Sequence, residues 1–391
     1  MSHLFTMRRA RGFSIVELMI SVVIGMLALL FATRLMVGGE QNRQAALGGS
    51  DSMQNGMLAM FSISNDVAQS GYGLNDPLLA GCNTVFADTQ GYALAPATRA
   101  GVAITPLGAA IIESNGTAPD RITLYAGSSM SGTGTLRVTS DYTGGTLINV
   151  DRIPYGFSQD DVIVVAPETL GGNCALAQIS AVVSPASPGQ QSLLVAAGGH
   201  NRFNAGALGA TFSGGKARLF NLGRFDKLSF HSWSVADGFL QLRATDLAGA
   251  GAAPSTVIDN VVSIKAQYGF DTRVGTGFQP QGGNQVAQWS PTMIDADSDG
   301  TAGSAGDYQR IAAIRIAVVA RSKAPEKPDA SGACSATTVL PTVFATASPS
   351  NVAAVPMTVD VTVAGDPISW KCYRYRVFET IVPLRNASWR P

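Results

Sequence analysis

The sequence contains few charged residues and very few histidines for its length. Of 391 residues, 14% are charged, 46% are hydrophobic and only three are histidine. High hydrophobicity with low charge argues against a disordered chain. Together with the 43 glycines, this composition indicates a loop-rich β protein that carries an apolar segment.

Basic clusters are also lacking beyond the first dozen residues. The chain has 27 basic and 27 acidic residues, and no acid accompanies Arg8, Arg9 and Arg11 among the first twelve. Loss of these three arginines with Met1–Gly12 would leave a net charge near −3. Such a surface attracts a polyphosphate backbone only weakly, so we expect no nucleic-acid partner.

The four cysteines, Cys82, Cys174, Cys334 and Cys372, form no CxxC pair. This spacing argues against a zinc knuckle and a thioredoxin-like site, and favours structural disulfides if the chain reaches an oxidising periplasm. Three connectivities are possible, and proximity in the sequence favours Cys82–Cys174 and Cys334–Cys372. Free buried thiols are the alternative.

A long apolar segment follows the three arginines. Leu18–Thr33 contains sixteen residues without a charge, and Phe13–Val37 is long enough to span a bilayer as a helix at roughly 1.5 Å per residue. The preceding arginines predict that the amino terminus stays in the cytoplasm and that the rest is exported. A secretory signal would have its small-residue cleavage site after this segment, where Arg34 and Leu35 stand instead.

Glu17 is the unusual residue of this segment. An ionisable side chain in a spanning helix costs at least a few kcal/mol and generally marks function. One alternative is that Glu17 lies at the headgroup level and reaches water. The other is that a cation or hydrogen-bond donors meet the carboxylate.

The stretch RGFSIVELMISVVI, from Arg11 to Ile24, resembles the class III leader of type IV pilins and type II secretion pseudopilins. The resemblance implies that a prepilin peptidase cuts between Gly12 and Phe13 and methylates the amine of Phe13. The helix is then retained in the inner membrane. Glu17 falls on the family's characteristic glutamate, which is proposed to pair with the terminal amine of a neighbouring subunit during assembly.

Residues 38–72 are expected to continue the helix as an amphipathic segment. Apolar residues recur mostly at three- and four-residue spacing: Leu47, Met53, Met57, Met60, Phe61, Ile63 and Val67. We expect this stripe to contact the following domain. Gly38-Gly39 and Gly48-Gly49 predict bending or local melting, and Gly71-Tyr72-Gly73 predicts the end of the helix.

Residues 73–391 are expected to form a periplasmic domain of mostly antiparallel strands, because short β-rich runs alternate with turn residues. The runs are 121–125, 147–150, 162–166, 179–183, 193–196, 217–222, 227–233, 239–243, 261–270, 311–319, 357–363 and 373–384. The predicted fold class is therefore α+β, with the helix on a large β domain. The alanine- and glycine-rich stretch 248–255 predicts a loop or a boundary between two lobes.

Three later stretches resemble one branch of the pilins, the PilW-type minor pilins. They are AQYGFD at 266–271, IAAIRIAVVARS at 311–322 and RVFETIVPLRN at 376–386. The resemblance implies that the protein associates with other minor and major pilins and primes pilus assembly. A pilus-tip adhesin and a J-type pseudopilin of type II secretion are the alternatives, although the length favours the pilus branch.

The loop 295–300, with the sequence DADSDG, repeats the opening of a calcium-binding loop. Its side-chain ligands would be Asp295, Asp297 and Asp299, with a carbonyl from Thr301 and a further oxygen from Asp307. The twelfth position is Gly306 instead of a bidentate glutamate, so calcium would bind weakly. The alternative is an acidic surface turn without a metal, and no cofactor is required.

Catalytic motifs are not evident. His200 lies in a predicted loop and His231 on a predicted strand, and neither belongs to a recognisable nucleophile, zinc or phosphate motif. Asp160-Asp161 is typical of a turn before a strand. We therefore expect a protein that is not an enzyme.

Overall fold

The computed structural model describes residues 14–129, 134–183, 191–198, 201–329 and 331–388. Side chains at 37, 38, 40–48 and 281 are also outside the description. The chain divides into two units, Met1–Ser50 and Asp51–Pro391. The expected leader 1–12, with Gly12, lies outside the described residues, as do Phe13 and His200.

One helix, α1 (Ile15–Gln69), contains the boundary between the two units. It is helical throughout, including Gly38-Gly39 and Gly48-Gly49, where the sequence predicted bending or melting. Each glycine lowers the stability of a helix interior by about 1 kcal/mol relative to alanine, and this loss does not interrupt the helix here. The helix ends before Gly71, which has a φ of 81° and donates its N–H to the carbonyl of Tyr125.

The second unit is rich in short strands. They are β1 (Asn83–Val85), β2 (Ala97–Arg99), β3 (Val102–Ile104), β4 (Ala110–Glu113), β5 (Arg121–Ala126), β6 (Leu136–Arg137), β7 (Leu147–Val150), β8 (Asp161–Pro167), β9 (Asn173–Gln178), β10 (Ala181–Val183), β11 (Gln191–Leu194), β12 (Ala217–Arg224), β13 (Ser229–Ala236), β14 (Phe239–Ala244), β15 (Ser255–Asp259), β16 (Val261–Phe270), β17 (Gln288–Ser290), β18 (Ile311–Arg321), β19 (Thr342–Val343), β20 (Met357–Thr358) and β21 (Tyr375–Pro383). The short helices are η1 (Phe225–Lys227), η2 (Gly275–Gly277), η3 (Pro280–Gly282), α2 (Ala305–Gln309), η4 (Trp370–Cys372) and α3 (Arg385–Ser388).

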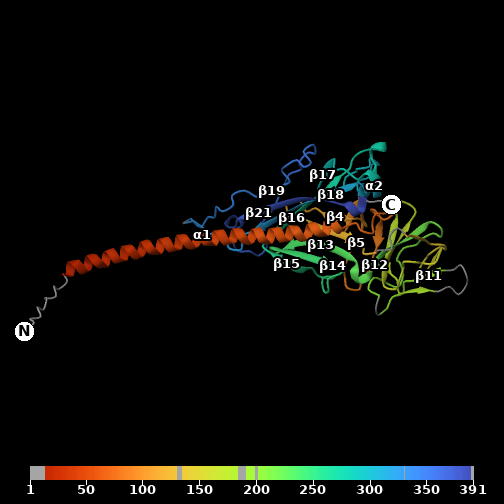
Figure 1. Cartoon of the computed structure of the whole chain (residues 1–391), viewed down its shortest axis with the longest axis horizontal. Helices are drawn as coiled ribbons and strands as arrows, with labels where there is room; N and C mark the ends of the chain where they lie inside the picture. The colour runs from red at the N-terminus through yellow and green to blue at the C-terminus, as the bar shows by residue number, and fades with distance from the viewer. Residues whose placement is uncertain (1–13, 130–133, 184–190, 199–200, 330, 389–391) are drawn as a thin grey trace, which may run out of the picture. The chain divides into compact units, whose positions relative to one another are not determined.

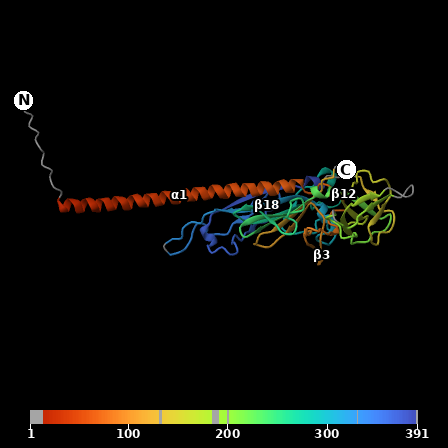
Figure 2. The ribbon, with the colours of Figure 1, turned by 90° about the horizontal axis from the view of Figure 1, so that it is seen from below.

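These strands form sheets with the orders β15-β14-β13-β5-β4, β17-β16-β18-β21, β1-β9-β8-β12-β6 and β10-β11-β7, together with the pairs β19-β20 and β2-β3. Among the described strands, β1 and β9 pair in parallel and the other pairs are antiparallel. A long helix followed by a mostly antiparallel β domain confirms the predicted α+β class. Within the second unit, α1 runs along the β-strands in both views (Figures 1 and 2).

The main hydrophobic core joins α1 to two sheets. It contains Ala59, Ile63 and Val67 of the helix, Phe230 of β13 and Ile316 of β18. Gly56 lies close to β21, since a Cβ atom at this position would be 2.0 Å from the Phe378 ring. The small residues of the helix therefore permit its close approach to the sheet.

The helical stripe predicted from the sequence is partly wrong. Ile63 and Val67 are fully buried, but Met53, Met57 and Phe61 are 47%, 55% and 70% exposed. The buried positions Ser52, Gly56, Ala59, Ile63 and Val67 follow each other at spacings of three or four residues. Successive helical residues are separated by about 100° around the axis, which places the larger Met and Phe side chains on a neighbouring, exposed face.

A second core lies in residues 136–219. Strand β8 separates the two cores, because Val162, Val164 and Ala166 contribute to the first and Ile163 and Val165 to the second. Burial on both faces explains the continuous apolar run of this strand. The stretch 248–255, which we predicted to be a loop or a boundary between lobes, lies between β14 and the start of β15 at Ser255, and these two strands pair with each other.

Most of the predicted strands are present, and 147–150 and 261–270 match their observed bounds. The run 357–363 is an exception, since only Met357–Thr358 is a strand. Val359 and Val361 are nevertheless fully buried in a cluster with Val319 of β18. The apolar alternation in this run therefore reflects contact with a sheet face, without strand pairing beyond Thr358.

Both predicted disulfides, Cys82–Cys174 and Cys334–Cys372, are confirmed. The first crosslinks residues 92 positions apart, beside the parallel pairing of β1 with β9. The second closes a loop of 38 positions that leads into β21. Crosslinks over such separations stabilise a fold by restricting the unfolded chain.

Candidate functional site

The amino-terminal part of α1 is apolar and exposed. Every side chain from Ser14 to Met36 is exposed, and Ile15–Met36 is long and apolar enough to cross a membrane by length and composition. Contact with lipid or with other apolar helices would remove this surface from water. The segment agrees with the predicted span 13–37 over its described residues.

Glu17 lies in the first turn of this helix. An acidic side chain is favoured here, because the unpaired N–H groups at a helix start carry partial positive charge. The Ser21 hydroxyl donates to the backbone carbonyl of Glu17, but within the described residues the carboxylate has no hydrogen bond or ion pair. The Glu17 carboxylate is therefore available to a cationic group. Gly12 and Phe13 lie outside the described residues, so cleavage between them and methylation of Phe13 stay predictions.

The acidic loop brings three of its predicted ligands together. Asp295, Asp297 and Asp299 each offer a carboxylate oxygen, and these oxygens lie within 4.8 Å of one another. Ser298 has a φ of 63° and Gly300 a φ of 88°, so the chain turns sharply between them. Hard oxygen ligands converging on one point fit the preference of calcium.

Asp307 makes structural contacts that the sequence did not predict. It is fully buried, and its carboxylate accepts hydrogen bonds from the backbone N–H groups of Ala296 (2.5 Å), Asp297 (3.2 Å) and Ser304 (2.9 Å). Burial raises the pKa of Asp307, against the lowering effect of these three donors. Its oxygens thus hold the acidic loop onto α2, and the predicted contact of Asp307 with calcium stays a prediction.

Gly306 explains why the loop lacks a glutamate at its twelfth position. A Cβ atom there would lie 1.7 Å from an Asp297 carboxylate oxygen. A side chain at this position would therefore displace one of the three converging acids. Calcium would have to complete its coordination with backbone carbonyls, such as that of Thr301, and water.

Arg99 connects the acidic loop to the first disulfide. Its guanidinium donates to the carbonyls of Gly303 (2.8 Å), Gly171 (2.9 Å) and Gly81. Gly81 directly precedes Cys82 of the disulfide. One planar cation therefore joins three loops through hydrogen bonds to their backbone carbonyls.

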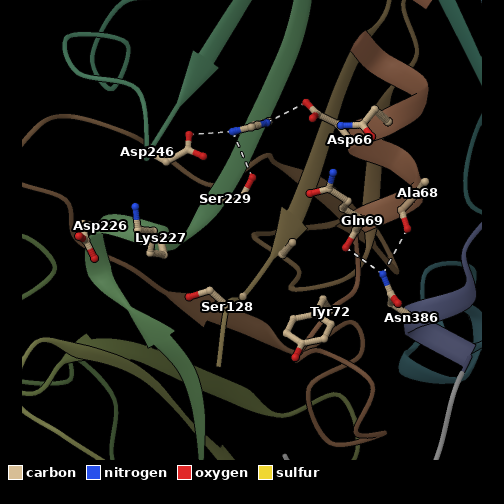
Figure 3. A pocket seen from close by; sticks show the side chains of 14 residues that line it. Asp66, Ala68, Gln69, Tyr72, Ser128, Asp226, Lys227, Ser229, Asp246 and Asn386 are labelled. Atoms are coloured by element: carbon tan, nitrogen blue, oxygen red, sulfur yellow. Dashed lines mark hydrogen bonds and ion pairs between the residues drawn. The ribbon is translucent and has the colours of Figure 1, made fainter. Parts of the chain in front are cut away.

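His231 forms a cluster with two aspartates, which the sequence did not predict. Its Nδ1 lies 2.8 Å from the carboxylate of Asp66 on α1, and its Nε2 lies 2.8 Å from that of Asp246 after β14 (Figure 3). The Trp233 indole also donates to Asp66 at 2.8 Å. These contacts join the helix, β13 and the connection after β14.

The charge state of this cluster follows from its geometry. Burial lowers the pKa of His231, but the hydrogen bonds and charges of Asp246 and Asp66 outweigh burial and raise the pKa to about 9. Burial would raise the pKa of Asp246, and its bond to His231 lowers it below the ordinary value. At neutral pH the ring is therefore protonated between two carboxylates, and an imidazolium without a free lone pair cannot act as a general base.

Asn386 is a further residue that sequence reasoning missed. Its side-chain amide donates to the carbonyls of Ala68 (3.2 Å), Gln69 (3.0 Å) and Ser70 (3.4 Å). It thereby satisfies carbonyls that have no partner at the end of α1. The carboxy-terminal stretch 376–386 thus supplies both the strand beside Gly56 and the cap of the same helix.

The His231 cluster predicts a specific dependence of stability on pH. Since the folded state raises the pKa of His231 from 6.5 to about 9, its contribution is complete below pH 6.5 and is lost as the pH rises through about 9. We expect the free energy of unfolding to fall by on the order of 2 kcal/mol between pH 6.5 and 9.5. Urea unfolding of the oxidised protein measures this change. His231→Gln should remove most of the slope, and an equal slope in this variant would contradict the assignment.

Two family models match the chain. The model described as type IV pilus-assembly protein W matches residues 234–386, and the model of the prokaryotic N-terminal methylation motif matches residues 7–33. No significant match was found among curated proteins or solved structures. The first match contains the sheet β17-β16-β18-β21, the acidic loop and Asn386, and the second contains Glu17.

The two matches confirm the resemblance seen at both ends of the sequence. The methylation motif coincides with the apolar start of α1, and the match over 234–386 contains Phe378 and Asn386, which contact the later part of the same helix. The chain is therefore similar to type IV pilus-assembly protein W over residues 234–386 and carries a prokaryotic N-terminal methylation motif over residues 7–33.

Proposed function

We propose that this protein is a minor pilin that is anchored in the inner membrane by Ile15–Met36 and primes or joins the assembly of a type IV pilus. Its partners are other minor and major pilins. The observation that carries the proposal is Glu17, an acid without a partner in the described chain, in the first turn of an exposed apolar helix that matches the methylation motif.

Charge neutralisation gives Glu17 its role. Cleavage by prepilin peptidase between Gly12 and Phe13 would create a terminal amine four residues before Glu17. Both groups would be costly in an apolar environment if unpaired. Pairing the amine of one subunit with the Glu17 carboxylate of the next satisfies both and fixes the axial register of the helices.

The exposed face of α1 in the second unit supports a role in subunit contact. Met53, Met57, Leu58 and Phe61 are 47–70% exposed and carry no charge. Residues four apart on a helix form a ridge that fits between the side chains of another helix. We propose that a neighbouring pilin helix covers this ridge in the filament.

The location of the second unit follows from the same proposal. The three arginines before the apolar segment favour a cytoplasmic amino terminus, which supports a location of residues 51–391 in the periplasm or on the pilus. Two disulfides are compatible with that oxidising compartment. The match over 234–386 favours the pilus branch over a type II secretion pseudopilin.

The role of Glu17 can be tested in the native host. We expect Glu17→Ala to be processed normally but to lower filament number or incorporation of the protein several-fold, because the terminal amine loses its partner. Glu40→Ala, at another acid of α1 outside Ile15–Met36, is the matched control and should leave assembly unchanged. Normal piliation and normal co-purification of partner pilins with Glu17→Ala would contradict the proposal.

We also propose that the acidic loop binds calcium weakly through Asp295, Asp297 and Asp299. The support is the convergence of their carboxylate oxygens and the space that Gly306 leaves for Asp297. A bound cation would offset the repulsion among the three acids and order the loop that Arg99 connects to the first disulfide.

Calcium binding predicts a rise in thermal stability. We expect millimolar calcium to raise the Tm of the full chain by on the order of 2 °C, because the ion binds the folded state. Asp297→Asn should abolish the rise, whereas Asp237→Asn, at an exposed aspartate on the β13–β14 turn, should keep it. No shift in the unaltered protein, or an equal shift in Asp297→Asn, would remove the calcium proposal.

A further inference from the structure

A large cavity lies at the end of α1, beside the start of β13. Its volume is about 660 Å³, within the range of roughly 300–1000 Å³ typical of ligand sites. Its walls come from the last turns of α1, the end of β5, the segment 226–231, Asp246 and Asn386 (Figure 3). All of these segments belong to the second unit.

One wall of the cavity is rigid and chemically satisfied. Asp66 and Asp246 bind the two ring nitrogens of His231, and Ser229 contacts the same ring at 3.1 Å. The side-chain amide of Asn386 donates hydrogen bonds to the backbone carbonyls at the end of the helix. These groups are held in place before any ligand arrives, which lowers the entropic cost of binding.

The remaining polar groups around the cavity have no such partners. Within the described residues, the side chains of Gln69, Tyr72, Ser128 and Lys227 make no hydrogen bond or ion pair, although all four line the cavity (Figure 3). Tyr72 is 43% exposed and presents an aromatic ring with a polar tip. The cavity thus combines an aromatic surface with free hydroxyl, amide and ammonium groups.

The charges of the cavity favour a neutral ligand. His231 balances the carboxylates of Asp66 and Asp246, and Asp226 forms an ion pair with Arg224 at 3.2 Å. With Lys227 included, three acidic side chains (Asp66, Asp226 and Asp246) are offset by three basic ones (Arg224, His231 and Lys227). The cavity therefore has no net positive charge to attract a polyanion, and a lipid chain would leave its polar groups unsatisfied.

We propose that this cavity binds a neutral saccharide, with the Tyr72 ring against the apolar face of one sugar and with Gln69, Ser128 and Lys227 bonded to its hydroxyls. A sugar offers both a C–H face and many hydroxyl groups, which matches a site that holds an aromatic ring beside unpartnered donors and acceptors. This binding function goes beyond filament assembly and does not depend on it.

The test uses the full chain in lipid nanodiscs prepared without glycolipids or sugar-based detergents, because their headgroups would compete. Titration calorimetry with maltotriose and with triacetylchitotriose should show saturable binding of at least one of them. Tyr72→Ala and Lys227→Ala should each weaken that binding on the order of tenfold or more. Tyr155→Ala and Lys323→Ala, at exposed residues outside the cavity, are the matched controls and should bind as the unaltered protein does.

Three outcomes would overturn the proposal. They are the lack of saturable binding of both sugars, equal affinity in the Tyr72→Ala and Lys227→Ala variants, and tighter binding of trigalacturonate than of either neutral sugar. Because Tyr72 is exposed, its variant should keep the melting temperature of the unaltered protein, which separates loss of the site from loss of the fold. Assembly of pili by Tyr72→Ala cells would be unaffected in either case, so this test is independent of the Glu17 test.

Discussion

The contact of α1 with the two sheets is the constraint on which the second unit depends. Gly56, Ala59, Ile63 and Val67 form one buried face, and Gly56 lies directly against the Phe378 ring of β21. Because this face of the helix is buried in the domain core, the apolar residues on its other faces are exposed and can contact other molecules. Two parts of the helix therefore expose apolar surface: the amino-terminal apolar segment and the ridge from Met53 to Phe61. Contact with a membrane or with neighbouring pilin helices would remove this surface from water.

The end of α1 is fixed by polar contacts from distant parts of the chain. Asp66 accepts from Trp233 and binds His231, and Asn386 caps the last carbonyls. These contacts make the helix end, β13 and the carboxy terminus one structural element, and the same element forms a wall of the cavity. The cavity therefore lies at one end of a helix whose other end, Ile15–Met36, is long and apolar enough to cross a membrane.

Local patterns allowed much of this structure to be predicted. The apolar run with Glu17 predicted the helix, alternating and β-branched runs predicted most strands, and proximity predicted the Cys82–Cys174 and Cys334–Cys372 pairs. The buried helix face was harder to predict, because glycine and alanine contribute little to a hydrophobic pattern that Met53 and Phe61 dominate. The bonds Asp66–His231 and Gln69–Asn386 span 165 and 317 residues, so no local pattern could indicate them.

The central claim is that α1 is retained in the mature protein as a pilin helix with a new terminal amine. The mass of the intact protein purified from its native host tests this claim most directly. The account predicts a chain that begins at Phe13, carries one added methyl group on its terminal amine and retains both disulfides. An intact Met1, or a first residue beyond Met36, would contradict it.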